Sequence, residues 1–241
     1  PRSPMNSIGI ALGMMTLICN ADNDWVELIP EGKLDAFKKA SPKFVWTDKI
    51  SLDSAKQNKL VASKDKGAIL FNNNEGLPGL VTNQSFGDHE IHLEFLVAKG
   101  SNSGIKMHML YEIQIFDSFG KTDLTGSDCG GVYPRWEYKP AFTYIDKGVP
   151  PSKNACKPAG EWQTLDITFI APSFDEAGNK VKNARLPKVL LNGELIHDNV
   201  ELLTPTGNNF KLKEKSKAPI MIQVDHGPVA FKNIKVRELQ K

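Results

Sequence analysis

The sequence has few cysteines and almost no excess of charge. Only three of its 241 residues are cysteines, and none are spaced as CxxC, which argues against a structural zinc site. Thirty basic and 28 acidic residues give a formal net charge of +2. Nucleic-acid binding is therefore not expected. The one lysine-rich segment is interpreted as a solvated loop and comprises Lys211, Lys213, Lys215 and Lys217.

Common catalytic and metal-binding signatures are also missing. The chain has no GxSxG motif, no phosphate-binding loop and no Cys/His nucleophile arrangement. Asp117, Asp123 and Asp128 lack the dense spacing of oxygen ligands found in calcium loops. The sequence does not identify a cofactor, and a divalent metal ion is the candidate.

No apolar run is long enough to cross a membrane. The run over residues 8–18 is shorter than the roughly 20 residues that a transmembrane helix needs. It follows Arg2 and precedes Ala21, a layout typical of a signal peptide over residues 1–21. We therefore predict an exported protein: periplasmic, secreted or surface-associated. A lipid anchor at Cys19 and a buried N-terminal strand are the alternatives.

Removal of the leader would leave Cys129 and Cys156. In an exported protein this pair is a candidate disulfide, which would stabilise the fold by on the order of 3 kcal/mol. Two separate buried thiols are the alternative.

The sequence is rich in β-strand periodicity. Apolar and polar residues alternate over residues 91–97, 111–115 and 165–169, and Gly- and Pro-rich turns separate the stretches. Asn192-Gly193 predicts a type I′ hairpin. The alternation of inward-facing apolar residues shifts by one position between Phe231 and Ile234, which predicts a β-bulge at Lys232-Asn233. We predict an all-β protein whose residues 22–241 form a single two-sheet antiparallel β-sandwich of jelly-roll type.

Polar side chains gather in the stretch over residues 101–118. The apolar residues of 111–115 point into the core, so Glu112 and Gln114 point the other way, side by side. The polar break that begins at Asn102 is expected to turn the chain beside the same face.

A carboxylate pair is one interpretation of this region. If the strands over 91–97, 105–109 and 111–116 formed a meander, Glu94 and Glu112 would share a face with Lys106 or His108. Glu112 with Glu94 or Asp117 could then act as acid and base. Asp117 faces that side only if the strand ends or bulges before it. A solvated sheet face is the alternative.

A histidine in a turn is the second chemical candidate. His226 follows Asp225 between two predicted strands and could act as a general base or as a metal ligand oriented by a carboxylate. An ordinary turn histidine is the alternative. The irregular, aromatic-rich stretch over residues 119–161 is expected to wall a pocket.

Five blocks of sequence carry a resemblance to a known family: residues 102–105, 111–118, 129–133, 154–163 and 225–234. Together they resemble the 3-keto-disaccharide hydrolase domain, which has a concanavalin A-like sandwich. The resemblance runs from about Asp24 to Leu239. Leu96 and Leu110 depart from it, because family members often have basic residues at these positions.

The resemblance implies an exported bacterial enzyme acting on glycosides whose C3 hydroxyl is oxidised to a ketone. The ketone acidifies the C2 proton, so a base can remove it and the aglycone can leave, with water added later. We hypothesise that Glu112 or His226 is the base or a metal ligand, with Asp117 as a further catalytic candidate. The expected contacts to the sugar or its enolate are Asn102, Gln114, Tyr133, Lys157 and Glu94.

Three other functions compete with this one. A non-catalytic carbohydrate-binding module fits the sandwich and the aromatic loop equally well. A conventional glucanase fits less well, because Gln114 and Phe116 stand where its carboxylates would be. A structural or adhesive surface protein is the third.

Overall fold

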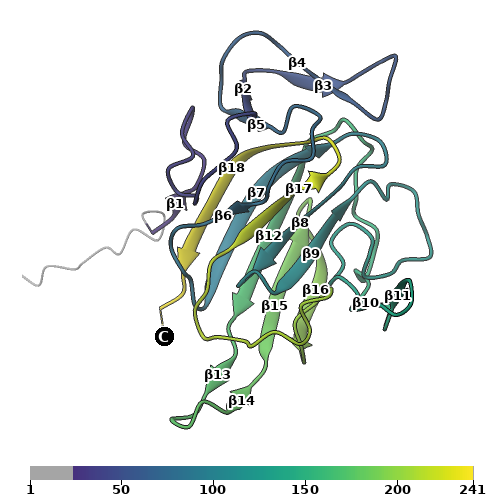
Figure 1. The fold of residues 1–241 in the computed structure, drawn as a ribbon. Helices are drawn as coiled ribbons and strands as arrows, with labels where there is room; N and C mark the ends of the chain where they lie inside the picture. Colours follow the sequence, from purple (N-terminus) through teal and green to yellow (C-terminus); the bar gives the residue numbers. More distant parts are fainter. Residues whose placement is uncertain (1–23, 241) are drawn as a thin grey trace, which may run out of the picture.

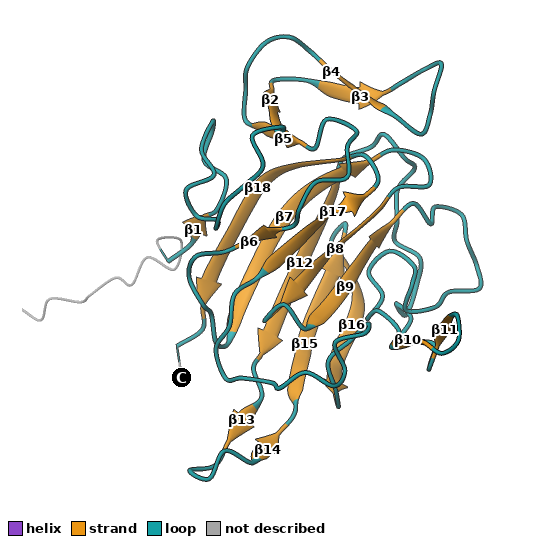
Figure 2. Ribbon diagram, viewed as in Figure 1, coloured by secondary structure: helices purple, strands orange, loops and turns teal. Residues whose placement is uncertain are grey.

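The computed structural model describes residues 24–240, which form two antiparallel sheets and three small hairpins (Figures 1 and 2). The larger sheet has the order β16 (Glu194–Leu202), β15 (Ala184–Leu191), β12 (Gln163–Ile170), β7 (His89–Val97), β18 (Val229–Glu238), β5 (Ile69–Phe71) and β2 (Val45–Thr47), with β1 (Val26–Glu27) paired to β18. The smaller sheet has the order β6 (Leu80–Val81), β17 (Met221–His226), β8 (Asn102–Met107) and β9 (Tyr111–Phe116). The hairpins are β3 (Ile50–Leu52) with β4 (Leu60–Ala62), β10 (Trp136–Tyr138) with β11 (Phe142–Tyr144), and β13 (Ser173–Phe174) with β14 (Lys180–Lys182).

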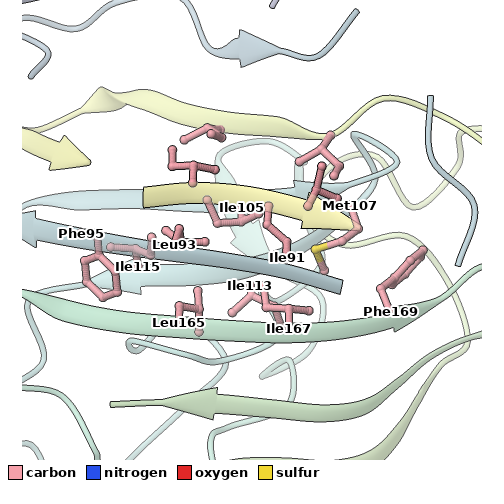
Figure 3. Packing of buried hydrophobic residues seen from close by; sticks show 14 of the residues in the cluster. Ile91, Leu93, Phe95, Ile105, Met107, Ile113, Ile115, Leu165, Ile167 and Phe169 are labelled. Atoms are coloured by element: carbon pink, nitrogen blue, oxygen red, sulfur yellow. The ribbon is translucent and has the colours of Figure 1, made fainter. Parts of the chain in front are cut away.

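The core lies between the two sheets. Figure 3 shows apolar side chains of β7 and β12 beside those of β8 and β9, among them Leu93, Ile105 and Ile113. All three are fully buried, and each such side chain contributes roughly 1.5–3 kcal/mol of transfer free energy. The predicted two-sheet β-sandwich is confirmed.

Local sequence signals are also confirmed. Asn192 and Gly193 have φ angles of 54° and 79°, as a type I′ turn requires, and they connect β15 directly to β16. The pairing of β18 with β7 shifts register between Lys232 and Lys235, and Asn233 has a φ angle of 51°. This is the predicted bulge.

The predicted strand neighbours are partly wrong. β8 pairs with β9 as expected, but β7 lies in the larger sheet, so the three strands do not form a meander. The turn after His226 likewise carries the chain from β17 in one sheet to β18 in the other. The alternation of apolar and polar residues predicts which face of a strand is buried, but it does not predict which sheet the strand joins.

The predicted signal peptide lies outside the described residues. Within residues 24–240, no helix has the length and hydropathy needed to cross a bilayer.

Buried histidines and aromatic rings pack at one end of the core. The ring centroid of His89 lies 5.2 Å from that of Phe169 and 6.2 Å from that of His108. Burial lowers the pKa of His89 to about 4 and also lowers the pKa of His108. Both rings are therefore neutral in the folded protein at neutral pH.

We predict that His89 makes the fold sensitive to acid. Between about pH 6.5 and pH 4 the unfolded chain binds a proton that folded His89 does not, so stability falls as the pH falls, by roughly 3 kcal/mol for this group. His89→Phe should remove this part of the pH dependence, measured as the free energy of unfolding in urea from pH 4 to 7. His92→Asn, on the outer face of the same strand, is the control. An unchanged pH dependence in His89→Phe would contradict the assignment.

Candidate active site

The outer face of the smaller sheet carries a group of polar side chains arranged around Gly104. In the strand register, Gly104 of β8 lies between Gln223 of β17 and Gln114 of β9. One end of this face has the pair His226 and Asn102. The other end has Lys106 paired with Glu112, and Met221 beside Lys106.

Glu112 is a buried carboxylate on this face. Its side chain is 5% exposed, and its nearer oxygen lies 3.4 Å from the ammonium of Lys106. Burial raises its pKa, and Lys106 opposes that rise. A glycine at position 104 makes the arrangement possible, because a Cβ atom there would clash with the Glu112 carboxylate. The group is therefore a candidate proton donor or acceptor.

His226 and Asp225 form a second pair. His226 Nδ1 lies 2.5 Å from Asp225 Oδ1. A carboxylate can only accept, so Nδ1 carries the hydrogen, and Nε2 of the neutral ring is left as a proton acceptor. The His226 side chain is 55% exposed, which leaves it accessible to a ligand. Both residues of this pair also act electrostatically on Glu112.

Amide groups lie between the two pairs. Gln114 Nε2 donates to Asn102 Oδ1 at 3.3 Å. The side-chain oxygens of Gln114 and Gln223 are buried and have no hydrogen-bond partner. Buried acceptors without partners are rare because they lose their hydration. Each oxygen has almost no accessible surface, so it would meet a ligand only after its side chain turned.

The segment over residues 130–133 covers the outer edge of β9. Gly130 N donates to Gln114 O, Gln114 N to Gly131 O and Tyr133 N to Glu112 O. Buried His197 lies with its Nε2 2.7 Å from Gly130 O and fixes the segment from the larger sheet. Burial raises the pKa of Tyr133, whose hydroxyl lies 3.3 Å from that of Tyr144 on the β10–β11 hairpin.

Comparison with known proteins places this chain in a family. The model of the 3-keto-alpha-glucoside-1,2-lyase-like domain matches residues 24–237. The chain belongs to this family. No curated protein gives a significant match.

Solved structures share the fold. Two glycosyl hydrolases of provisional assignment from Parabacteroides distasonis superpose with TM-scores of 0.60 and 0.57, at 22% and 19% identity. Each alignment covers 90% of this chain, and 84% and 100% of the respective relatives. At these identities the likeness shows a shared fold.

The site unites many of the predicted residues of this lyase-like domain. Glu112, Gln114 and Asn102 share the face as expected, and Tyr133 borders it. His226 reaches the same face through its pairing with Asn102.

The predicted position of Glu94 beside Glu112 is wrong. Glu94 lies on β7 of the larger sheet, where Lys232 and Asn233 bind its carboxylate. It therefore does not share a face with Glu112. The meander that would have joined them is absent, and we assign Glu94 no part in the site.

Asp117 and Lys157 are bound elsewhere. β9 ends at Phe116, and the Asp117 carboxylate accepts from the Gly100 amide at 2.9 Å, which holds the turn before β8. Lys157 Nζ donates to the Trp162 carbonyl at 3.2 Å within its own loop. Their predicted roles in catalysis and substrate binding gain no support from these contacts.

Several residues of the face were not predicted from the sequence. Gln223 alternates with buried Ile222 and Val224, a signal that could have placed it beside His226. The Thr206 hydroxyl accepts a hydrogen bond from the Glu112 backbone amide at 3.0 Å, and no sequence pattern predicts this contact. Residues 24–240 contain no group of three or more His, Cys, Asp or Glu side chains suited to hold a metal ion.

The two cysteines lie together, as predicted, but as thiols. Cys129 and Cys156 are buried and free, so the predicted disulfide is not present in the structure. A hydrogen bond between them raises the pKa of Cys129 and lowers that of Cys156 to about 7. Cys129 immediately precedes the segment that covers β9.

We predict that a mild oxidant joins these thiols in the folded protein. Each thiol gives up its hydrogen to the oxidant as the sulfur–sulfur bond forms, so the mass falls by two hydrogen atoms. The bond should raise the free energy of unfolding by on the order of 3 kcal/mol. Intact mass and urea unfolding check this, with Cys129→Ser as the control. Two thiols still titratable after oxidation and unfolding would contradict it.

Proposed function

We propose that this protein cleaves 3-keto-glycosides by elimination across C1 and C2. The observation that carries the proposal is the arrangement of two proton-transfer groups, Glu112 with Lys106 and His226 with Asp225, on one sheet face. Membership of the lyase-like family supports the same chemistry. The reacting sugar would lie over Gly104, where the Glu112 carboxylate takes the space that a Cβ atom would fill.

His226 is assigned the role of base. Its Nε2 takes the proton from C2, which the neighbouring ketone has acidified, and the electron pair forms the enolate of C2 and C3. Asp225 holds the imidazole in the required tautomer and stabilises the imidazolium that results.

Glu112 is assigned the role of acid. As the enolate returns its electrons, the C3 ketone reforms, a double bond forms between C1 and C2, and the bond from C1 to the aglycone oxygen breaks. The raised pKa of Glu112 suits it to protonate that oxygen. Lys106 supplies positive charge for the enolate. Later addition of water across the double bond gives the free 3-keto sugar.

The amides are assigned to substrate orientation. As the sugar binds, the side chains of Gln114 and Gln223 turn toward it, and their unpartnered oxygens accept hydrogen bonds from its hydroxyl groups. Such contacts hold C2 next to the base, and orientation of this kind lowers the barrier substantially.

A panel of glycosides tests the reaction class. The protein should release aglycone from 3-keto-glucosides and leave the unoxidised parents intact, because only the ketone acidifies C2. His226→Asn should slow release by about 100-fold or more, with His92→Asn as the control. Loss of aglycone release on addition of a chelator would show that the reaction also requires a metal ion. Sugar binding without release from any substrate would instead favour a carbohydrate-binding module.

The acid role predicts a dependence on the leaving group. Glu112→Gln should slow release of an alkyl alcohol by about 100-fold or more, but should affect release of 4-nitrophenolate only slightly, since that group needs no proton. For the parent protein, release of the alkyl alcohol should decline as the pH rises through the raised pKa of Glu112. Equal losses for both leaving groups in Glu112→Gln would remove the acid role.

A further inference from the structure

A pocket of about 490 Å³ opens at the Lys106 end of the candidate active site. Apolar side chains that line it include Leu110, Leu212 and Met221, and Lys213 and Lys215 also line it. A larger pocket, of about 870 Å³, lies beside the β13–β14 hairpin and shares no lining residue with the site. Of these two pockets, the smaller one is therefore the one that adjoins the candidate active site.

The pocket and the site share residues. Lys106 lines the pocket and also lies 3.4 Å from the Glu112 carboxylate. Met221 is its neighbour across the strand pairing of β8 and β17. Since Glu112 is assigned to protonate the departing oxygen, whatever is attached to that oxygen leaves toward Lys106 and this pocket.

The lining carries positive charge that nothing in it balances. Within residues 24–240, no Asp or Glu lines the pocket. Among the described residues, neither Lys213 nor Lys215 forms an ion pair within 4 Å. Glu214, which lies between them in sequence, is bound instead by Tyr111 and Lys180. An anionic group in the pocket would therefore meet two uncompensated ammonium groups.

We propose that this pocket is a leaving-group subsite selective for aglycones that join a carbon ring to a carboxylate. The inference rests on the proposed function. The apolar side chains contact the ring, and Lys213 and Lys215 attract the carboxylate. A hydroxyaryl acid and a uronic acid both have this chemistry, so the experiment includes both.

The test compares charged and neutral leaving groups. Substrates are the 3-keto-glucosides of 4-hydroxybenzoate and of its methyl ester, together with 3-keto disaccharides ending in glucuronate and in glucose. We expect KM to be roughly five- to tenfold lower for the charged member of one pair or both, and the advantage to shrink with added salt because the lysines are exposed. The pair that shows it identifies the class of acid.

Matched substitutions locate the effect. The double variant Lys213→Gln/Lys215→Gln should lose the advantage while turnover of the neutral substrates is unchanged. Lys211→Gln, in the same segment but outside the lining, should keep it. Equal KM values for charged and neutral members, or an advantage that survives the double variant, would overturn the subsite. No turnover of any of the four substrates would instead count against the proposed function.

Discussion

The site depends on burying one carboxylate on the outer face of a sheet. In a two-layer sandwich that face ordinarily meets water, where a carboxylate has no reason to change its pKa. Here the segment over residues 130–133 docks on the edge of β9 and the missing side chain at Gly104 leaves room for Glu112. Burial and Lys106 then act on Glu112 in opposite directions, and burial wins.

Close backbone packing holds that covering segment in place. Gly126, Gly131 and Gly148 meet one another or Val132 so closely that a Cβ atom on any of them would clash with backbone. His197 binds the segment from the larger sheet. These glycines let parts of the irregular stretch pack closely against one another. The segment that they hold then pairs with β9 as another strand would.

The sequence predicted local structure well and long-range pairing poorly. Alternation placed Glu112 and Gln114 on the face opposite the core, and Asn192-Gly193 and the bulge near Asn233 followed from local backbone preferences. These features depend on residues near in sequence. The error over Glu94 arose because strands consecutive in the chain joined different sheets, which a periodic pattern does not encode.

The same distinction between local structure and long-range pairing explains which residues of the site could be predicted. Asn102 and Glu112 were found because they lie on paired, consecutive strands, whereas Gln223 and Thr206 reach the site from distant parts of the chain. Asp117 and Lys157 were plausible by residue type, yet Asp117 binds backbone of the turn before β8 and Lys157 binds backbone of its own loop. Chemistry-bearing residues can be recognised from sequence, but their partners are set by the tertiary fold.

In the proposed reaction, removal of the C2 proton is the first step. The most direct measurement compares release of the aglycone from a 3-keto-glucoside carrying hydrogen or deuterium at C2, with the unsaturated product followed at the same time. The account predicts severalfold slower release from the deuterated substrate and a product with a double bond between C1 and C2. Equal rates, together with direct formation of the hydrated sugar and no exchange of the C2 hydrogen with solvent, would contradict it.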